Sequence, residues 1–412
     1  MFRAMGRYRM SNETIYEELG VPHVVNATGT KTRIGGSRIR PEAMDAMARA
    51  SEAFVRLSDL QAEASELIAE VTGADAGYIT AGASSALALG AAACIAGDDI
   101  GAMARLPETE GVPDEIVMPR THRTGYDHAL RAVGARIVDV GTNDRHLGTG
   151  SRNVEPWEIA DAIGENTAAV AYVEKSYTEP PLDVVCDIAH DEGVPVIVDA
   201  AAELPPMSNL SAFIDAGADL VAFSGGKAIR GPQTTGILAG GADLIESVAA
   251  QHLDMHAAEA VWEPAPKLVH PGRLGGVPRQ GIGRSMKVGK EELVGLIRAL
   301  QLFVEEDHDA VIEEWLERAR RIAAELDDVD GLEPSLTTDD KTAVAPEVVV
   351  SVDPEVAGVT ATDIVGGLRR EEPRVFVGGD ALPAGEFTVN PMCLTDDEAD
   401  YAVERIVAHV EE

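Results

Sequence analysis

The sequence is poor in cysteine and has no long apolar segment. Its three cysteines, Cys94, Cys186 and Cys393, are widely separated, and no CxxC pair is present. This usage supports neither a zinc cluster nor a disulfide framework and fits a reducing cytoplasm. The longest weakly polar run, 81–97, is rich in Ala, Gly and Ser and is short for a membrane span. No apolar run follows the arginines of the first ten residues, so no signal peptide is predicted and we expect a cytoplasmic protein.

Basic residues are also scarce. Asp and Glu total 70 against 34 Lys and Arg, which gives a formal net charge of −36, and only 7 of the basic residues are lysines. Phosphate backbones and anionic membranes attract basic surfaces, so we expect neither a nucleic-acid partner nor a membrane partner. We interpret the excess of acid as a solvated surface suited to high salt, as in a halophile.

Apolar strands and helices alternate between residues 76 and 250. With 45% hydrophobic residues, the chain can bury a sizeable core. The alternation predicts an α/β fold in which helices cover both faces of a parallel or mixed sheet. The expected strands are 76–80, 115–118, 136–140, 167–173, 194–198, 220–223 and 236–239.

A different pattern begins near residue 286, where helical periodicity with many Glu and Arg runs over 291–326. Strand-like runs at 347–352 and 374–377 and a last helix over 396–410 follow. We expect a long helix leading into a smaller α+β domain. The predicted parts are an N-terminal segment (1–20), a large domain (21–285) and a linking helix with a small C-terminal domain (286–412).

The most informative segment is LVAFSGGKAIRGPQ at 220–233, where an apolar strand leads through two glycines to Lys227. Enzymes that use pyridoxal 5'-phosphate (PLP) need such a lysine, because it must form a Schiff base from a fixed position with a lowered pKa. The glycines would let the backbone approach the cofactor closely. An ordinary surface turn with a solvated lysine is the alternative.

Two further segments fit the same chemistry. Asp199 directly follows the expected buried strand 194–198. It precedes Lys227 by 28 residues, which leaves room for one helix and one strand between them. Ligands of α/β sheets bind outside such strand ends, and a carboxylate there can pair with the pyridine nitrogen. The turn TAGASS at 80–85 opens a helix whose N–H groups could bind a phosphate. Each segment alone is ambiguous, since Asp and Ser are also common helix caps.

Together, these segments make the sequence resemble the fold-type I PLP-dependent enzymes, and within them the group of selenocysteine synthase and D-glucosaminate-6-phosphate ammonia-lyase. The resemblance runs from about residue 21 to the end of the chain. It implies a seven-stranded, mixed and mostly parallel sheet. The residues that carry it are VNATGT at 25–30, GGS at 35–37, ITAGA at 79–83, VDAAAELP at 198–205, FSGGK at 223–227, RGPQ at 230–233 and GRSMKVGKEE at 283–292.

The resemblance also implies roles for single residues. Lys227 would carry PLP and act as acid and base at the substrate Cα, and Asp199 would hold the pyridine nitrogen. His122 would stack on the ring, with an unspecialised loop histidine as the alternative, and Gln233 would lie in a loop that can reach the neighbouring subunit's site. The phosphate cradle would be Gly82, Ala83, Ser84 and Ser224. Arginines that could clamp a substrate carboxylate or phosphate are Arg33, Arg230, Arg284 and Arg374.

The resemblance implies elimination of a β-hydroxyl from a 2-amino-3-hydroxy acid, which gives a 2-keto acid and ammonia. A hydroxy-amino acid or an amino-sugar acid is the expected substrate, and a homodimer or a larger homo-oligomer is the expected assembly. Selenium transfer on seryl-tRNA is less favoured, because the block at 25–30 comes too early to follow a tRNA-gripping domain. Aldol cleavage, racemisation, amino transfer and a non-catalytic PLP-binding protein stay open as alternatives.

Overall fold

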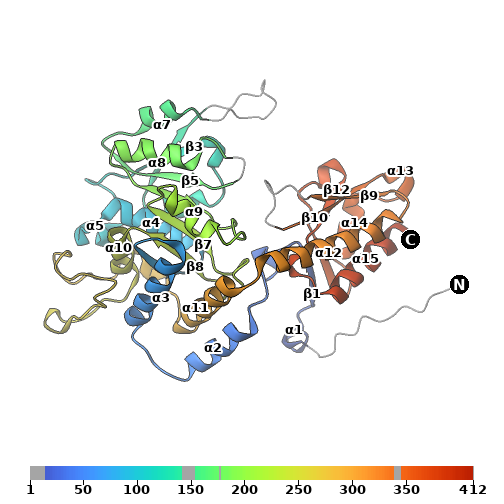
Figure 1. Cartoon of the computed structure of the whole chain (residues 1–412), viewed down its shortest axis with the longest axis horizontal. Coiled ribbons are helices and arrows are strands. Elements are labelled where there is room, and N and C mark those ends of the chain that lie inside the picture. The colour runs from blue at the N-terminus through green and yellow to red at the C-terminus, as the bar shows by residue number, and fades with distance from the viewer. Residues whose placement is uncertain (1–13, 142–153, 176–177, 338–344, 412) are drawn as a thin grey trace. The chain divides into compact units, whose positions relative to one another are not determined.

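A computed structural model describes residues 14–141, 154–175, 178–337 and 345–411 (Figure 1). The described residues form two compact units. Ile39–Glu306 is the larger unit, and the smaller one combines the described parts of Met1–Arg38 and Asp307–Glu412. Residues 1–13 of the expected N-terminal segment lie outside the described residues.

The larger unit is built on a sheet to which the described residues contribute seven strands in the order β2-β8-β7-β6-β5-β3-β4. All neighbouring strands are parallel except β8, which is antiparallel to both β2 and β7. The α/β fold class is therefore confirmed. The strands are β2 (Ala76–Thr80), β3 (Glu115–Pro119), β4 (Arg136–Val140), β5 (Thr167–Val173), β6 (Val196–Asp199), β7 (Leu220–Ser224) and β8 (Gly236–Gly240).

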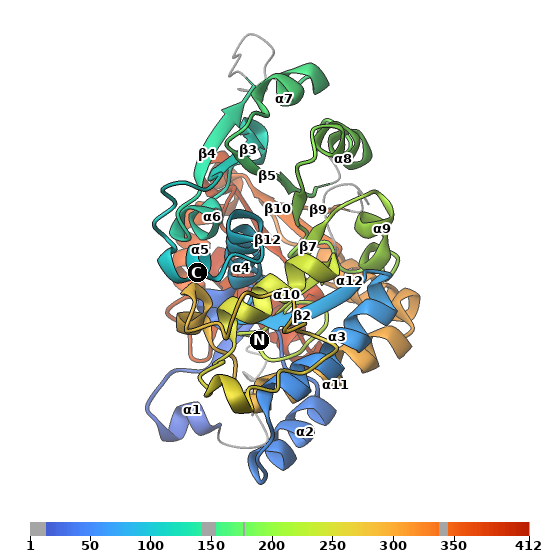
Figure 2. The same ribbon diagram turned by 90° about the vertical axis from the view of Figure 1, so that its left-hand side faces the viewer.

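Helices cover both faces of this sheet because its central strands are apolar on both sides (Figure 2). On one face, α4 (Ala83–Ala96) packs against five strands, and its small side chains allow a close approach. On the other face, α3 (Leu57–Thr72), α8 (Leu182–Asp191) and α9 (Asn209–Asp215) contact the sheet. The remaining helices are α2 (Pro41–Ser51), α5 (Ile100–Arg105), α6 (Asp127–Ala132), α7 (Pro156–Ala162), α10 (Ala242–His252) and α11 (Lys290–Glu305).

The smaller unit has its own core. β1 (Val24–Ala27) pairs in parallel with β11 (Arg374–Val377), and β12 (Glu386–Val389), β10 (Glu347–Val352) and β9 (Leu332–Thr337) form an antiparallel sheet. β10 alternates buried and half-buried residues, as expected for a strand with one covered face. The helices are α1 (Ile15–Glu18), α12 (His308–Asp327), α13 (Pro354–Ala357), α14 (Ala361–Leu368) and α15 (Asp396–Glu411).

This division differs from the boundaries expected at residues 20 and 285. α11 belongs to the larger unit, because its apolar face packs against α2 and α3. β1 belongs to the smaller unit, because its hydrogen-bonded partner is β11, about 350 residues further along the chain. Pairing over such a distance leaves no trace in local periodicity.

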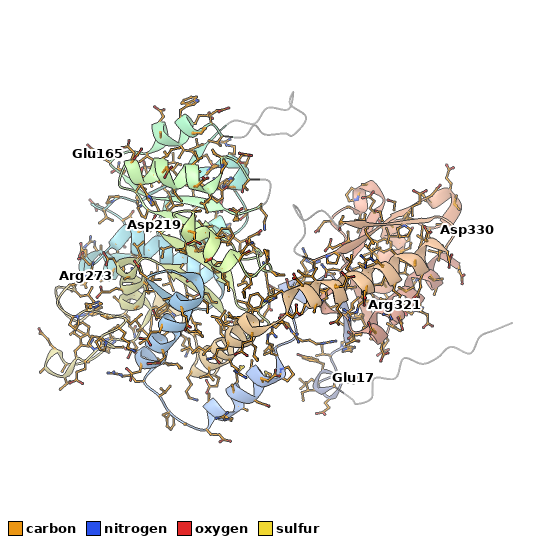
Figure 3. All side chains as sticks on the ribbon, in the orientation of Figure 1. Glu17, Glu165, Asp219, Arg273, Arg321 and Asp330 are labelled. Atoms are coloured by element: carbon orange, nitrogen blue, oxygen red, sulfur yellow. The ribbon has the colours of Figure 1, made fainter. Side chains whose placement is uncertain are left out.

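The surface carries many acidic side chains, and several arginines serve as their partners. Arg321 lies 3.2 Å from Asp396 and 3.3 Å from Asp400, and Arg273 pairs with Asp243. Figure 3 labels both arginines. Pairing of this kind is a reason not to treat every arginine as a substrate ligand. Among the helices of the described residues, none combines the length and the apolar character that crossing a membrane requires.

Candidate active site

Lys227 lies in a closed turn that directly follows β7. The Gly225 N–H donates to the Thr235 carbonyl oxygen (2.9 Å), and the Gly231 N–H donates to the Gly225 carbonyl oxygen (2.9 Å). Lys227 itself is half-buried within this ring of seven residues. The turn therefore gives the lysine a fixed position at the end of a buried strand, as a Schiff-base lysine requires.

The two glycines before Lys227 are required by packing within the chain. A Cβ atom at Gly226 would lie 2.6 Å from the Cα atom of Gln233, and one at Gly225 would collide with the Thr235 hydroxyl. The expectation that this pair lets the backbone approach the cofactor stays a prediction, and the structure adds a second reason for glycine at both positions. The structural task of the pair is to let two stretches of the same loop pass each other.

Asp199 ends β6, the strand next to β7, and its register partner on β7 is Ala222. One carboxylate oxygen accepts a hydrogen bond from the Ala201 N–H (3.1 Å). Burial raises the pKa of Asp199, while the positive charges of Lys227 and Lys175 oppose the shift. A half-buried carboxylate with lysines nearby can keep a pyridine nitrogen protonated.

The turn before α4 reaches the same edge of the sheet. Gly236, at the start of β8, pairs with Thr80 at the end of β2 and with Ser224 at the end of β7. Gly82 follows with a φ of 89°, a conformation that glycine adopts without strain, and caps the 14-residue helix α4. The free N–H groups at the start of a helix, with the exposed Ser84 beside them, are suited to a phosphate.

These features fit PLP through the chemistry of their groups. The N-terminus of α4 offers donors for the phosphate, Asp199 offers an acceptor for the pyridine nitrogen, and Lys227 offers an amine for the aldehyde. All three follow strand ends on one edge of the sheet, where open α/β sheets bind their ligands.

His122 also follows a strand at this edge, but its environment does not suit the expected stacking role. The ring is only 1% exposed and packs edge-on against Tyr172, with centroids 4.6 Å apart. Its Nδ1 atom accepts a hydrogen bond from the Val173 N–H (3.3 Å), and burial lowers its pKa to about 4. No ring face lies open to a cofactor, so His122 acts here as a neutral histidine that packs against β5.

The four candidate arginines fall into two groups. Arg230 and Arg284 belong to the larger unit with Lys227, and Arg284 lies 4.0 Å from Asp254. Arg33 and Arg374 are exposed residues of the smaller unit. Arg374 begins β11 opposite the first residue of β1, whereas Arg33 follows the last residue of β1. Arg374 therefore lies at the start of the β1–β11 pair, and Arg33 lies in the short turn of residues 32–34 that follows β1.

Glu174 is a residue of this edge that the sequence analysis missed. It follows β5, and its N–H donates to the carbonyl oxygen of Asp199 (3.0 Å). Burial and the negative charge of Glu203 raise its pKa to about 7, while Lys175, which pairs with Glu203, opposes the shift. The signal was present in the sequence, because Glu174 follows a buried strand just as Asp199 does.

Replacing Glu174 with glutamine should change how stability depends on pH. The pKa of Glu174 lies at about 7 in the folded chain against an ordinary value of 4.5, so the folded state retains a proton that the unfolded state has lost. Stability of the wild type should fall as pH rises between these values, and E174Q should escape this loss. Thermal unfolding from pH 4 to 8 measures it. Glu165→Gln, at an exposed site, is the control, and parallel curves for E174Q and wild type would contradict the prediction.

Comparison with known proteins agrees with this geometry. The sequence profile of the aminotransferase class-V family matches residues 127–270. Over 400 residues the chain is 32% identical to D-glucosaminate-6-phosphate ammonia lyase of Salmonella typhimurium (strain 14028s / SGSC 2262), which covers 95% of this chain and 96% of that protein. The chain belongs to the fold-type I PLP-dependent enzymes. The resemblance found in the sequence is thereby confirmed.

Other relatives of this PLP-dependent enzyme differ in their reactions. A 5'-C-glycyluridine monooxygenase-decarboxylase of a Streptomyces species is 32% identical over 95% of this chain and 90% of that protein. An L-seryl-tRNA(Sec) selenium transferase of Nitratidesulfovibrio vulgaris is 26% identical over 74% of this chain and 62% of that protein. A solved structure of D-glucosaminate-6-phosphate ammonia-lyase superposes with a TM-score of 0.80 at 31% identity, over 98% of this chain and 99% of that one. The three relatives are named for three different reactions, so membership of the family does not by itself fix the reaction.

Proposed function

We propose that this PLP-dependent enzyme is an ammonia-lyase acting on a 2-amino-3-hydroxy acid. The observation that carries the proposal is similarity to D-glucosaminate-6-phosphate ammonia lyase along nearly the whole of both chains, in sequence and in fold. An amino-sugar acid, with or without a phosphate, is the substrate class that this relative suggests. The net reaction converts the substrate to a 2-keto-3-deoxy acid and ammonia, with one water released and one consumed.

Each residue at the sheet edge has a task in this reaction. When bound, PLP supplies an electron sink for negative charge at the substrate Cα. The Lys227 amine would remove the proton at Cα and later return a proton to the product. The Asp199 carboxylate would keep the pyridine nitrogen protonated, and the N-terminus of α4 would hold the phosphate.

Glu174 would supply a proton at the same edge, where its backbone N–H donates to the Asp199 carbonyl oxygen (3.0 Å). The hydroxyl at the substrate Cβ must leave with a proton, and the donor works best when its pKa is near the working pH. Burial and Glu203 raise the pKa of Glu174 to about 7, which is suited to this task. We therefore assign to Glu174 the task of donating a proton to the hydroxyl that leaves Cβ.

The test is a substrate panel assayed for 2-keto acid and ammonia. The full-length chain with PLP is incubated with 2-amino-3-hydroxy acids, including 2-amino sugar acids with and without a terminal phosphate. We expect equal release of keto acid and ammonia from at least one of them. Lys227→Ala is the inactive control.

The same panel separates the alternative reactions. The Streptomyces relative is as similar as the Salmonella one, so oxygen uptake with 5'-C-glycyluridine is measured in parallel. Seryl-tRNA with a selenium donor tests the transferase reaction. Keto acid release from no hydroxy-amino acid, together with turnover in either parallel assay, would overturn the lyase proposal.

We also propose that the enzyme assembles with copies of itself. On the larger unit, Phe54 is fully exposed and Val261 is 70% exposed. Their loops lie together, because Arg56 donates to the carbonyl oxygen of Glu263 (2.6 Å). Exposed apolar side chains gathered in this way are typical of a protein interface. Light scattering should give a mass of at least twice 43.4 kDa.

A further inference from the structure

The turn that carries Lys227 contains a strained residue. Arg230 has a φ of 58°, and it is the only non-glycine residue with a positive φ in the part of the chain that the structure describes. Its N–H donates to the Lys227 carbonyl oxygen (3.0 Å), so the strained residue closes the turn that follows the lysine directly. An L-residue with a side chain adopts this backbone conformation only where its surroundings hold it.

One arginine from elsewhere in the larger unit holds this turn. The Arg40 backbone N–H donates to the Arg230 carbonyl oxygen (3.0 Å), and the Arg40 Nε atom donates to the Ile229 carbonyl oxygen (2.9 Å). Two successive carbonyl groups are thus fixed by a single residue. Arg40 precedes α2 as its N-cap, about 190 residues before the turn.

The Arg40 side chain is itself fixed by an ion pair. Its two terminal nitrogens donate to the two carboxylate oxygens of Glu306, at 2.9 and 2.6 Å. The Arg40 side chain is 9% exposed and the Glu306 side chain 22%. A bidentate ion pair between largely buried side chains is strong and directional, and a lysine at position 40 could not form it.

Glu306 is the C-cap residue of α11, and another residue of the same helix packs against the turn. A Cβ atom at Gly231 would lie 3.0 Å from a methyl carbon of Leu296 on α11. The turn is therefore held from two sides, by packing on α11 and by Arg40, which α11 anchors through Glu306.

We infer that Arg40 is a positioning residue, which holds the strained turn at Ile229 and Arg230 and so keeps the Lys227 amine at the end of β7. This inference rests on the proposed function only in taking Lys227 as the lysine that binds PLP. The holding of the turn is a property of the chain alone and can be measured without the cofactor.

The first measurement is amide hydrogen exchange of Arg230 and Gly231 in the full-length chain without added PLP. Arg40→Met should accelerate exchange at both amides by about tenfold, since Arg40 no longer holds the strained turn in which both amides form hydrogen bonds. Arg49→Met is the matched control, because Arg49 is exposed on the same helix, and it should change nothing. Glu306→Gln, which keeps Arg40 but weakens its anchor, should give a smaller acceleration and serves if Arg40→Met does not fold.

A double substitution separates positioning from a general loss of stability. Glycine adopts a φ of 58° without strain, so R230G should remove the backbone strain that the hydrogen bonds of Arg40 oppose. In that background, Arg40→Met should accelerate exchange by less than about threefold. Unchanged exchange in R40M, or an equal effect in both backgrounds, would overturn the inference.

The second measurement links the turn to Lys227. PLP is added to each variant, trapped on the lysine by reduction, and the labelled peptide is quantified over time. Arg40→Met should slow labelling of Lys227 by about tenfold and Arg49→Met should not. Absence of labelling at Lys227 in the wild type would refute the proposed function, but it would not affect the interpretation of the hydrogen-exchange result. Wild-type labelling with no effect of R40M would overturn the positioning role alone.

Discussion

Lys227→Ala should abolish covalent capture of PLP and lower the rate of keto acid release by about 10⁴-fold or more. The substitution removes both the amine that binds the aldehyde and the group that moves the proton at the substrate Cα. Two measurements check this result: the visible absorbance of the chain after addition of PLP, and the mass of the peptide 220–233 after reduction.

Lysine is scarce in this chain, so a matched control is easily chosen. Lys267 lies in the same unit, its side chain is 55% exposed, and it pairs with Glu66 at the surface. Lys267→Ala should retain the spectrum and the activity of the wild type. An unchanged spectrum in Lys227→Ala would show that PLP is held elsewhere and would refute the assignment.

Asp199→Asn should lower kcat by about 10²-fold while leaving PLP attached to Lys227. Asparagine has the same shape and can still accept the Ala201 N–H, so the strand end should keep its structure. It lacks the negative charge that keeps a pyridine nitrogen protonated, and a hydrogen bond to a charged group contributes about 1.5–3 kcal/mol. Steady-state rates and reductive trapping on the same samples separate chemistry from binding.

The control for this substitution is Asp215→Asn, an exposed position at the end of α9. It should match the wild type in both assays. If Asp199→Asn retained full kcat, the carboxylate would have no part in the electronics of the cofactor. If it lost PLP altogether, Asp199 would act in binding rather than in the chemical step.

Several elements were predictable because local signals determine them. The strand 167–173 and the strand around Asp199 are near-continuous apolar runs, and such runs are typical of strands buried on both faces. The turn with two glycines and a lysine after β7 was equally visible. β12 was missed, because it has only four residues and alternates with polar positions.

The candidate site was predictable in part for a similar reason. Strand ends are recognisable, and adjacent parallel strands bring their ends to one edge, so Asp199 and Lys227 could be placed together. The burial of His122 could not be foreseen, because it depends on Tyr172 from β5. Nor could the pairing of β1 with β11, which places Arg374 opposite Val24.

The sequence by itself determined the fold class, the family and the three groups that fit PLP, because each depends on a short run of residues. The tertiary structure alone decided what surrounds them. It showed that the glycine pair serves packing, that Glu174 lies beside Asp199 in a place that raises its pKa, and that Arg40 holds the turn after Lys227. These properties arise from contacts between residues far apart in the chain, and only the folded chain brings them together.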